Sequence, residues 1–546
     1  MITSFKRVLI CLLVAGARLG AGVPAPDADD GGLNLPPGFR ALIVADDLTA
    51  GRKIGNDSDQ LRFLAVAPNG DLYAKTARGG IFALHDSDGD GRFEAKHEFG
   101  SGGGTGIALH NGWLYHSTND DVFRYKLAPG ELVPTGQPET VIRGLPNGHQ
   151  HDAKSFAFGG DGQLYVEVGS PSNAYGNPDR AYMPPGTPPA DPSEFLKTHG
   201  GFWRFDPDRL NQTQADGYHF STGHRHVLAI AWNLQSNTFF VTQMGRDQLN
   251  VVAPEYYDTL DNAERVAEVM HRLYDGANLG WPYTYWDPFK KARMISPEFG
   301  GDNRKRAEAG KYDDPLVAFP AHWAPLQMAF YNGPQFPQKY QGGAFIAFHG
   351  SWNRAPLPQD GFNIAFVPFD QNGNPLGTYE IFATNAGATR YRMGGLAVGP
   401  DGSLYISETD RGRIWRIIYT GEIRPRSSSS ASRFNSAEAQ PSSANGSYTL
   451  FCAPCHMPDG SGAGQMQPAL AGSSVVRGDP TQLINVVLRG PAAVLPAGRA
   501  KYMNTMPSFS FLDNGQVADV LTYVRASFGS GASPITAEQV SAIRGK

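Results

Sequence analysis

Hydrophobic and polar residues alternate in short runs through most of the chain, and one short unit recurs. Each copy has two or three alternating apolar residues, a turn rich in Asp, Asn or Gly, and a second run with an aromatic residue. The six copies are LAVAPNGDLYAKT (64–76), IALHNGWLYHST (107–118), FAFGGDGQLYVEVG (156–169), LAIAWNLQSNTFFVTQ (228–243), AFIAFHGSWN (344–353) and LAVGPDGSLYISET (396–409). This period of two around PNG, GDG or PDG is typical of β-hairpins. Six imperfect, unevenly spaced copies predict an all-β, six-bladed β-propeller; a β-sandwich is the alternative, but sandwiches do not usually repeat one hairpin six times.

The alternating pattern stops after Arg424. Residues 425–445 are rich in Ser and poor in core-forming residues, which is typical of a flexible linker. Beyond it the apolar residues change to helical spacing, most clearly in NGQVADVLTYVRASF (514–528). We therefore predict a propeller domain at 35–424, a linker at 425–445 and a small all-α domain at 446–546.

The N-terminal sequence MITSFKRVLICLLVAGARLGAG has Lys6 and Arg7 before an apolar run from Val8 to Ala15, followed by small residues. This pattern predicts a secretory signal peptide at residues 1–22, too short to span a bilayer. No other apolar stretch approaches membrane length, so we expect an exported, periplasmic protein without a transmembrane segment.

The overall charge adds little to this picture. The chain has 47 Lys and Arg against 52 Asp and Glu, a net charge of -5, and no basic block, which argues against nucleic acid as a partner. The 65 Gly and 41 Pro agree with many tight turns. A GGGTG run at 102–106 precedes a predicted strand and not a helix, so NAD and FAD are disfavoured.

The predicted helical domain carries the motif FCAPCH (451–456). C-x-x-C-H is the attachment pattern of c-type haem, in which Cys452 and Cys455 bind the porphyrin and His456 ligates the iron. A local disulfide leaves the adjacent His unexplained, and a zinc site needs two further ligands. The sequence therefore predicts covalently bound haem c.

The sixth iron ligand is expected from KYMNTMPSFSF (501–511), which offers Met503 and Met506. We favour Met506 because Pro507 stiffens the loop that presents its sulfur. The carbonyl of Pro468 is expected to orient His456. Residues 446–546 resemble the class I cytochrome c domains that are fused to bacterial periplasmic dehydrogenases.

Polar motifs between the hairpins carry a second resemblance. In chain order they are GLPNGHQHDAKSFAFGGDGQLYVEVGS (144–170), TGHRH (222–226), QMGRDQL (243–249), GWPY (280–283), HGSWNR (349–354) and RYRMGGLAVGPDGSLYIS (390–407). Residues 35–420 thereby resemble the soluble pyrroloquinoline quinone (PQQ) enzymes: soluble glucose dehydrogenase, the aldose sugar and pyranose dehydrogenases, and most closely the sorbosone dehydrogenase group. The resemblance implies PQQ and calcium as cofactors.

The resemblance also implies roles for individual residues. His149 matches the general base, which takes the proton of the substrate hydroxyl while hydride passes to the quinone; its ordinary pKa suits that task. Arg225 matches the arginine that polarises the reactive quinone oxygen, and the adjacent His226 is expected to contact the cofactor. Without the resemblance, these residues would be a loop histidine and a loop salt bridge.

Further matches concern the PQQ carboxylates and the calcium ion. Arg390 and Arg392 match arginines that grip the carboxylates, and an i, i+2 pair on a strand points both side chains the same way. Arg354 is a third candidate. The backbone carbonyls of Gly245 and Arg246 match the calcium ligands.

Three departures from the family leave the substrate open. His226 replaces an Asn, Ser170 replaces an Asp that orients the base, and no Lys matches the cofactor lysine of soluble glucose dehydrogenases. Glu167 or Asp152 could orient the base instead. A separate run, HDSDGDGRFEAKH (85–97), begins like a calcium loop with Asp86, Asp88, Asp90 and Gly91, but His97 stands where a bidentate Glu belongs; an acidic turn and a weak calcium site remain open.

Together these features predict a quinohaemoprotein dehydrogenase that oxidises a sugar or a related aldehyde or hydroxyl compound. Electrons would pass to PQQ, then to haem, then to an external acceptor such as a soluble cytochrome or the respiratory chain. The alternatives are a calcium-dependent lactonase and a non-catalytic binding propeller, each with an electron-transfer module, because propellers host many chemistries.

Overall fold

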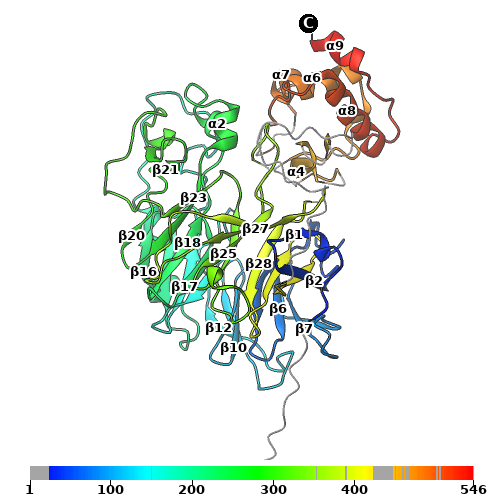
Figure 1. The fold of residues 1–546 in the computed structure, drawn as a ribbon. Coiled ribbons are helices and arrows are strands. Elements are labelled where there is room, and N and C mark those ends of the chain that lie inside the picture. Colours follow the sequence, from blue (N-terminus) through cyan, green and yellow to red (C-terminus); the bar gives the residue numbers. More distant parts are fainter. Residues whose placement is uncertain are drawn as a thin grey trace, which may run out of the picture.

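The computed structural model describes residues 24–148, 150–351, 353–387, 390–421, 447–448, 451–457, 460–462, 467–499, 502 and 506–544. The predicted signal peptide (1–22) and linker (425–445) lie outside these residues, as do His149 and Met503. The described residues form a ring of six β-sheets with a small helical domain at one end of the ring (Figure 1).

Each of the six sheets is a blade of four antiparallel strands, and two blades have a fifth strand. Blade 1 holds β5 (Leu61–Val66), β6 (Leu72–Thr76), β7 (Ile81–His85) and β8 (Ala95–Phe99). Blade 2 holds β9 (Ile107–His110), β10 (Trp113–Ser117), β11 (Val122–Lys126) and β12 (Glu139–Ile142). Blade 3 holds β13 (Phe156–Phe158), β14 (Leu164–Val168), β15 (Gly201–Phe205), β16 (Tyr218–Thr222) and the short parallel strand β20 (Ala277–Asn278).

The remaining three blades complete the ring. Blade 4 holds β17 (Val227–Asn233), β18 (Thr238–Gln243), β19 (Glu268–Leu273) and β23 (Val317–Phe319). Blade 5 holds β24 (Pro325–Phe330), β25 (Ala344–Phe348), β26 (Asn363–Val367), β27 (Glu380–Asn385) and β1 (Leu33–Asn34). Blade 6 holds β28 (Met393–Val398), β29 (Leu404–Glu408), β30 (Ile414–Tyr419) and β2 (Phe39–Ala45). The innermost strands contact one another in the order β5, β9, β13, β17, β24, β28 and back to β5, which confirms the six-bladed propeller.

The N-terminal strands close the ring, because β1 is the outer strand of blade 5 and β2 the outer strand of blade 6. β2 pairs with β30, with Phe39 opposite Tyr419. The ring of Phe39 lies edge-on to Phe336 at a centroid distance of 4.7 Å and to Phe382 at 5.0 Å. Such aromatic pairs add about 0.5–1.5 kcal/mol each beyond the area that they bury. The closing strand is therefore held by an aromatic core as well as by its hydrogen bonds.

Five of the six repeated units form the hairpin of the first two strands of a blade, as the sequence predicts. The fifth copy differs. Its residues begin at β25, the second strand of blade 5, while the innermost strand β24 comes earlier in the chain. Residues 331–343 separate these two strands, so the tight turn that marks the other copies is missing here.

Long loops extend from the ring on the side of the helical domain. They carry α1 (Leu249–Val252), α2 (Thr259–Glu264) and the hairpin of β21 (Thr284–Asp287) with β22 (Ala292–Ile295), as Figure 1 shows for α2 and β21. Asp258 caps α2 by accepting a hydrogen bond from the Asp261 amide at 2.7 Å. The other short elements are η1 (Asp30–Gly32), η2 (Phe195–Lys197), η3 (Gln214–Asp216), η4 (Pro297–Phe299), η5 (Gln338–Tyr340), β3 (Lys53–Ile54) and β4 (Asp57–Ser58).

The C-terminal domain is helical, as predicted. Its helices are α4 (Ala453–His456), α5 (Ser474–Arg477), α6 (Pro480–Arg489), α7 (Pro491–Val494), α8 (Asn514–Phe528) and α9 (Ala537–Arg544). The core forms where buried residues of α6, such as Leu483 and Ile484, meet Val517 and Leu521 of α8. Asp513 begins α8 with a capping box, in which it accepts from the Gln516 amide at 2.8 Å.

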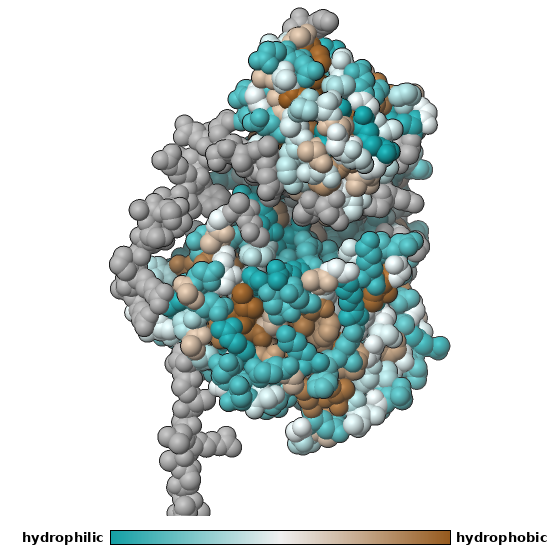
Figure 2. Space-filling view, turned by 90° about the vertical axis from the view of Figure 1, so that its right-hand side faces the viewer, coloured by the Kyte–Doolittle hydropathy of each residue, from teal (hydrophilic) through white to brown (hydrophobic). Residues whose placement is uncertain are grey.

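The surface of both domains mixes polar and apolar residues. Figure 2 shows one side of the molecule, on which hydrophobic residues form only small patches among hydrophilic ones. Within the part of the chain that the structure describes, no helix has both the length and the apolar character that a membrane crossing requires.

Candidate functional site

Arg225 is the best-defined candidate of the propeller site. It lies in the turn that leads into β17, and its side chain is 5% exposed. The guanidinium donates to both oxygens of Asn173, from Nε to the backbone carbonyl at 3.2 Å and from Nη2 to Oδ1 at 3.0 Å. Nη2 also pairs with Asp247 Oδ2 at 2.7 Å. Among the described residues, no acceptor lies on Nη1, which is therefore available to an anionic ligand.

Asp247 is the anion at the centre of this site. Besides Arg225, its carboxylate contacts Arg180 at 3.4 Å and His322 Nδ1 at 3.3 Å, and it accepts a hydrogen bond from Asn353 Nδ2 at 2.7 Å. Burial opposes ionisation, but Arg225 and the hydrogen bond from His322 hold the pKa of Asp247 well below its usual range. The carboxylate is therefore ionised at neutral pH, and it neutralises part of the positive charge that surrounds it.

His226 contacts a different carboxylate. Its Nδ1 lies 3.4 Å from Glu167 Oε1, which also accepts from the Val227 amide at 3.0 Å. Its ring lies 4.9 Å from that of His151, whose Nδ1 contacts the Ser170 carbonyl at 2.6 Å. Burial, with the charges of Arg225 and His226, lowers the pKa of His151 well below its usual value. His151 is therefore neutral at physiological pH.

The position of the predicted base, His149, lies outside the described residues, so its orientation stays a prediction. Of the two carboxylates proposed to orient it, Glu167 is fully buried and is bonded to Val227 and His226. Asp152 has a buried Oδ1 with no hydrogen-bond partner among the described residues.

Gly245 and Arg246, the predicted calcium ligands, line one small cavity together with Arg225. About 360 Å³ of unfilled space lies there, part of it open to solvent, and Trp281, Tyr285 and Trp286 are among its walls. Neither the Gly245 nor the Arg246 carbonyl accepts a hydrogen bond within the described part of the chain. Unbonded carbonyl oxygens are hard donors of the type that calcium prefers, so this turn fits the ion.

Two buried carboxylates support the same turn. Glu268 Oε2 accepts from the Gly245 amide at 2.8 Å, and burial raises the pKa of Glu268 to about 7. Glu298 pairs with the buried guanidinium of Arg246. The Arg246 guanidinium is thus paired with the carboxylate of Glu298, and the backbone carbonyl of Arg246 remains to ligate a metal ion.

The three predicted carboxylate-binding arginines do not line this cavity. Arg354 donates to backbone carbonyls, with Nε 3.2 Å from Pro358 O and Nη1 3.5 Å from Ala263 O. Arg390 is exposed. Arg392 is half-buried and donates to Gly350 O at 3.2 Å, and its Nε lies 3.6 Å from Asp410. The structure therefore brings Arg225, Gly245 and Arg246 together and places the other arginines apart from them.

The C-x-x-C-H motif lies on α4. The carbonyl of Pro468 lies 2.8 Å from His456 Nδ1, so the other ring nitrogen remains for a metal. Burial raises the pKa of both Cys452 and Cys455 to about 12. For Cys455 the positive charge of Arg392, a propeller residue, opposes this rise.

These residues line a cavity with about 910 Å³ of unfilled space, part of it open to solvent. Its walls on the side of the C-terminal domain are Phe451, Cys452, Cys455, His456, Gln467, Pro468, Met506, Pro507 and Phe509. The Gln467 side chain is buried, and neither its oxygen nor its nitrogen has a partner among the described residues. Two thiols, an oriented imidazole, a thioether and an unbonded amide around one cavity fit a c-type haem.

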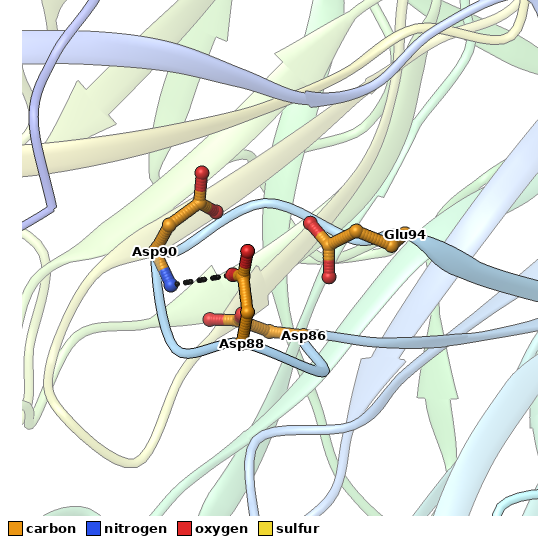
Figure 3. A group of neighbouring side chains, drawn as sticks. All are labelled: Asp86, Asp88, Asp90 and Glu94. Atoms are coloured by element: carbon orange, nitrogen blue, oxygen red, sulfur yellow. Dashed lines mark hydrogen bonds between the residues drawn. The ribbon is translucent and has the colours of Figure 1, made fainter.

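The acidic run in the loop between β7 and β8 forms a separate cluster, shown in Figure 3. Carboxylate oxygens of Asp86, Asp88, Asp90 and Glu94 lie within 4.8 Å of one another. The Asp90 amide donates to Asp88 Oδ1 at 3.1 Å. The calcium-loop pattern in the sequence does not include Glu94. In the structure Glu94, which precedes His97, supplies the fourth carboxylate of the cluster.

Several residues of the propeller site are not predicted from the sequence: Asp247, Asn173, Arg180, His322 and Asn353. A buried arginine requires an anion nearby, and Asp247 stands in the QMGRDQL motif directly after Arg246. That rule could have identified Asp247. The other four come from distant loops. Asn353 stands in the HGSWNR motif, but nothing in the sequence indicates that these four residues meet around Asp247.

Comparison with known proteins agrees with this division of the chain. Residues 33–420 match the family model described as TrAA12-like, and residues 444–527 match that of cytochrome c. The cytochrome c subunit of a quinone alcohol dehydrogenase from Gluconacetobacter polyoxogenes is 39% identical over 100 residues, which are 18% of this chain and 21% of the relative. The chain thus spans about a fifth of the length of this curated relative.

Two solved structures resemble the propeller. The calcium structure of a Trichoderma reesei enzyme of carbohydrate-active family AA12 has a TM-score of 0.56 at 18% identity, over 71% of this chain and 97% of that one. The holo form of the pyranose dehydrogenase PQQ domain from Coprinopsis cinerea has a TM-score of 0.55 at 19% identity, over 71% and 97%. These likenesses show the shared propeller fold. Because the family match covers well over half of the chain, the protein belongs to the TrAA12-like family and carries a C-terminal cytochrome c domain.

Proposed function

We propose that the protein is a periplasmic quinohaemoprotein dehydrogenase that oxidises a sugar or a related hydroxyl or aldehyde compound such as sorbosone. Its propeller would bind PQQ and calcium, its cytochrome domain would carry haem c, and an external one-electron acceptor such as a soluble cytochrome would reoxidise it. The observation that carries this proposal is the joint placement around one cavity of Arg225 Nη1 and the carbonyls of Gly245 and Arg246, none of which has a hydrogen-bond partner among the described residues.

The relatives support the same reading. Similar structures include one that contains calcium and one that is named as a PQQ domain of a pyranose dehydrogenase. The relative of the C-terminal domain is named as the cytochrome subunit of a quinone dehydrogenase. When bound, PQQ supplies a two-electron acceptor and haem supplies a one-electron carrier.

The chain's own residues would act as follows. Arg225 Nη1 would donate to an oxygen that gains negative charge, and the surrounding buried site strengthens that interaction. The carbonyls of Gly245 and Arg246 would hold calcium. His149 would accept the proton of the substrate hydroxyl, and Arg390 and Arg392, which do not line this cavity, would pair with carboxylates of the cofactor from outside it.

The test uses the mature full chain loaded with PQQ and calcium. Mixing it with a panel of aldoses, sorbosone-type aldehydes and polyols should reduce the haem, seen directly in its absorption spectrum, with at least one of them. The matched control is protein without PQQ, whose haem should remain oxidised. Absence of PQQ uptake in a calorimetric titration, or hydrolysis of a lactone by quinone-free protein, would contradict the proposal.

A further inference from the structure

The wall of the haem cavity is not made by the cytochrome domain alone. The propeller contributes Asn250 and Val251 of α1, Thr259 and Asn262 of α2, and Asn353 from the loop after β25. Ala355, from the same loop, packs against the hydrophobic core of the cytochrome domain. Figure 1 places α4, which carries the haem motif, on the side of the cytochrome helices that faces the propeller. The haem cavity is thus shared between the two domains.

The same propeller wall connects with the site around Arg225. The Asn353 side chain donates to Oδ1 of Asp247 at 2.7 Å, and Oδ2 of Asp247 pairs with Arg225 at the same distance. A second connection runs through His322. Its Nδ1 lies 3.3 Å from Asp247 Oδ1, and its Nε2 lies 2.7 Å from the backbone carbonyl of Asn262. Both asparagines line the haem cavity.

We propose that Asp247 and Asn353 form the contact through which the propeller site and the haem pocket are coupled, and that the propeller wall closes one side of the cavity in which the haem would bind. This inference rests on the proposed function. Asp247 is a positioning residue: one oxygen fixes Arg225, and the other fixes Asn353 at the haem cavity.

The physical basis is a short hydrogen-bonded chain in a buried setting, where such bonds are stronger than in water and orient one another. The bridge joins the two sites through side chains that are hydrogen-bonded directly to one another. Oxidation of one hydroxyl to a carbonyl releases two electrons and two protons. The electrons would cross this boundary one at a time, and the external one-electron acceptor named above would restore the ferric haem between transfers.

The test measures electron transfer between the centres without substrate. In full-length protein loaded with calcium and with chemically reduced PQQ, the haem is oxidised by a flash from a photosensitised ruthenium complex, and its re-reduction by the reduced quinone is followed. The variant Asn353→Ala should slow this step by about fivefold, which corresponds to the loss of one hydrogen bond of ordinary strength from the path between the two sites. The haem midpoint potential should stay unchanged in a spectroelectrochemical titration, because the change removes a contact and no charge.

The matched control is Asn372→Ala. Asn372 is exposed in the turn that follows β26, at the other end of that strand from the loop of Asn353. The rate of electron transfer in the Asn372→Ala variant should equal that of the wild type. Haem and PQQ contents are measured first in every variant, so that loss of a cofactor is not mistaken for slow electron transfer.

A double-mutant cycle completes the design. Asp247→Asn should slow transfer, and the double variant with Asn353→Ala should be no slower than the slower single variant, because both changes break one connection. Additive slowing in the double variant, or an unchanged rate in Asn353→Ala, would overturn the proposed coupling. Failure of the wild type to bind PQQ or to transfer electrons would instead refute the proposed function itself, and the coupling with it.

Discussion

Replacement of Asp247 by Asn tests the electrostatics of the propeller site, because it removes one charge and keeps the shape. The carboxylate is the anion nearest to Arg225, whose side chain is 5% exposed, and it also contacts Arg180 and His322. Removal of one partner of a buried ion pair costs about 3–5 kcal/mol, since the remaining charge has neither water nor an anion. For about 390 propeller residues with an unfolding entropy of about 2.1 cal/mol/K each, this corresponds to a Tm lower by about 4–6 °C.

The same change, Asp247→Asn, should increase the thermal stabilisation that the protein gains from PQQ and calcium. In Asp247→Asn the charge on Arg225 is unpaired, so a tricarboxylate that reaches Nη1 relieves a cost that the wild type does not have. The increase in Tm on addition of PQQ and calcium should therefore be larger in the variant than in the wild type. Differential scanning calorimetry of the full chain, with and without both cofactors, measures the two increases.

The control is Asp287→Asn, which removes a carboxylate that is more deeply buried than that of Asp247. Asp287 is fully buried and lies 3.1 Å from Arg265 Nε. This variant should lose a similar amount of stability, but its increase in Tm with PQQ should equal that of the wild type. If PQQ stabilises Asp247→Asn no more than it stabilises the wild type, Arg225 does not meet an anionic cofactor and the electrostatic reasoning is refuted.

Three further predictions follow from the two domains. Met506→Ala should shift the reduced haem spectrum toward high spin while Met503→Ala should not, and the opposite result would exchange their roles. His149→Ala should leave the haem content intact but abolish haem reduction by substrate, and an unchanged rate would remove His149 from the mechanism. Burial, reinforced by the charge of Asp410, raises the pKa of Glu408 from 4.5 to about 7. The folded state therefore binds this proton more tightly, and stability should fall by up to about 3 kcal/mol as the pH rises from about 4.5 to 7. Glu408→Gln should remove that fall in thermal unfolding scans at pH 5 and pH 8, whereas an identical pH dependence in the variant would contradict the assignment.

The elements that the sequence predicts well are those with local signals. The sequence predicts a helix at 514–528, and α8 occupies Asn514–Phe528, because Asp513 and Gln516 form the capping box and the apolar residues of the helix face one core. The hairpin units are likewise predicted by their turn residues and by the alternation of apolar and polar residues. The fifth blade departs from the pattern because its first two strands are joined by residues 331–343, without a tight turn.

The site is predicted less completely, since its parts come from distant loops. Arg225 and Asp247 are 22 residues apart and meet because the hairpin of β17 and β18 returns the chain to the same end of the blade. Asn353 is 106 residues from Asp247 and joins it from blade 5. No periodicity or turn signal specifies such pairs. The motifs contain some of these residues, but the arrangement of the blades in the folded ring determines which residues are in contact.

The uneven spacing of the repeats has a physical consequence at this end of the ring. The segments between β18 and β19 and between β25 and β26 are longer than a hairpin requires, and they supply α1, α2 and the loop of Asn353. These insertions form the propeller wall of the haem cavity, and Asp247 lies at the base of the first of them. A buried aspartate with three cationic or imidazole neighbours is stable only while each partner stays in place. The loops that face the haem cavity are therefore held by the same charged groups that form the propeller site. A substitution or a bound ligand at one of these sites should therefore alter the other.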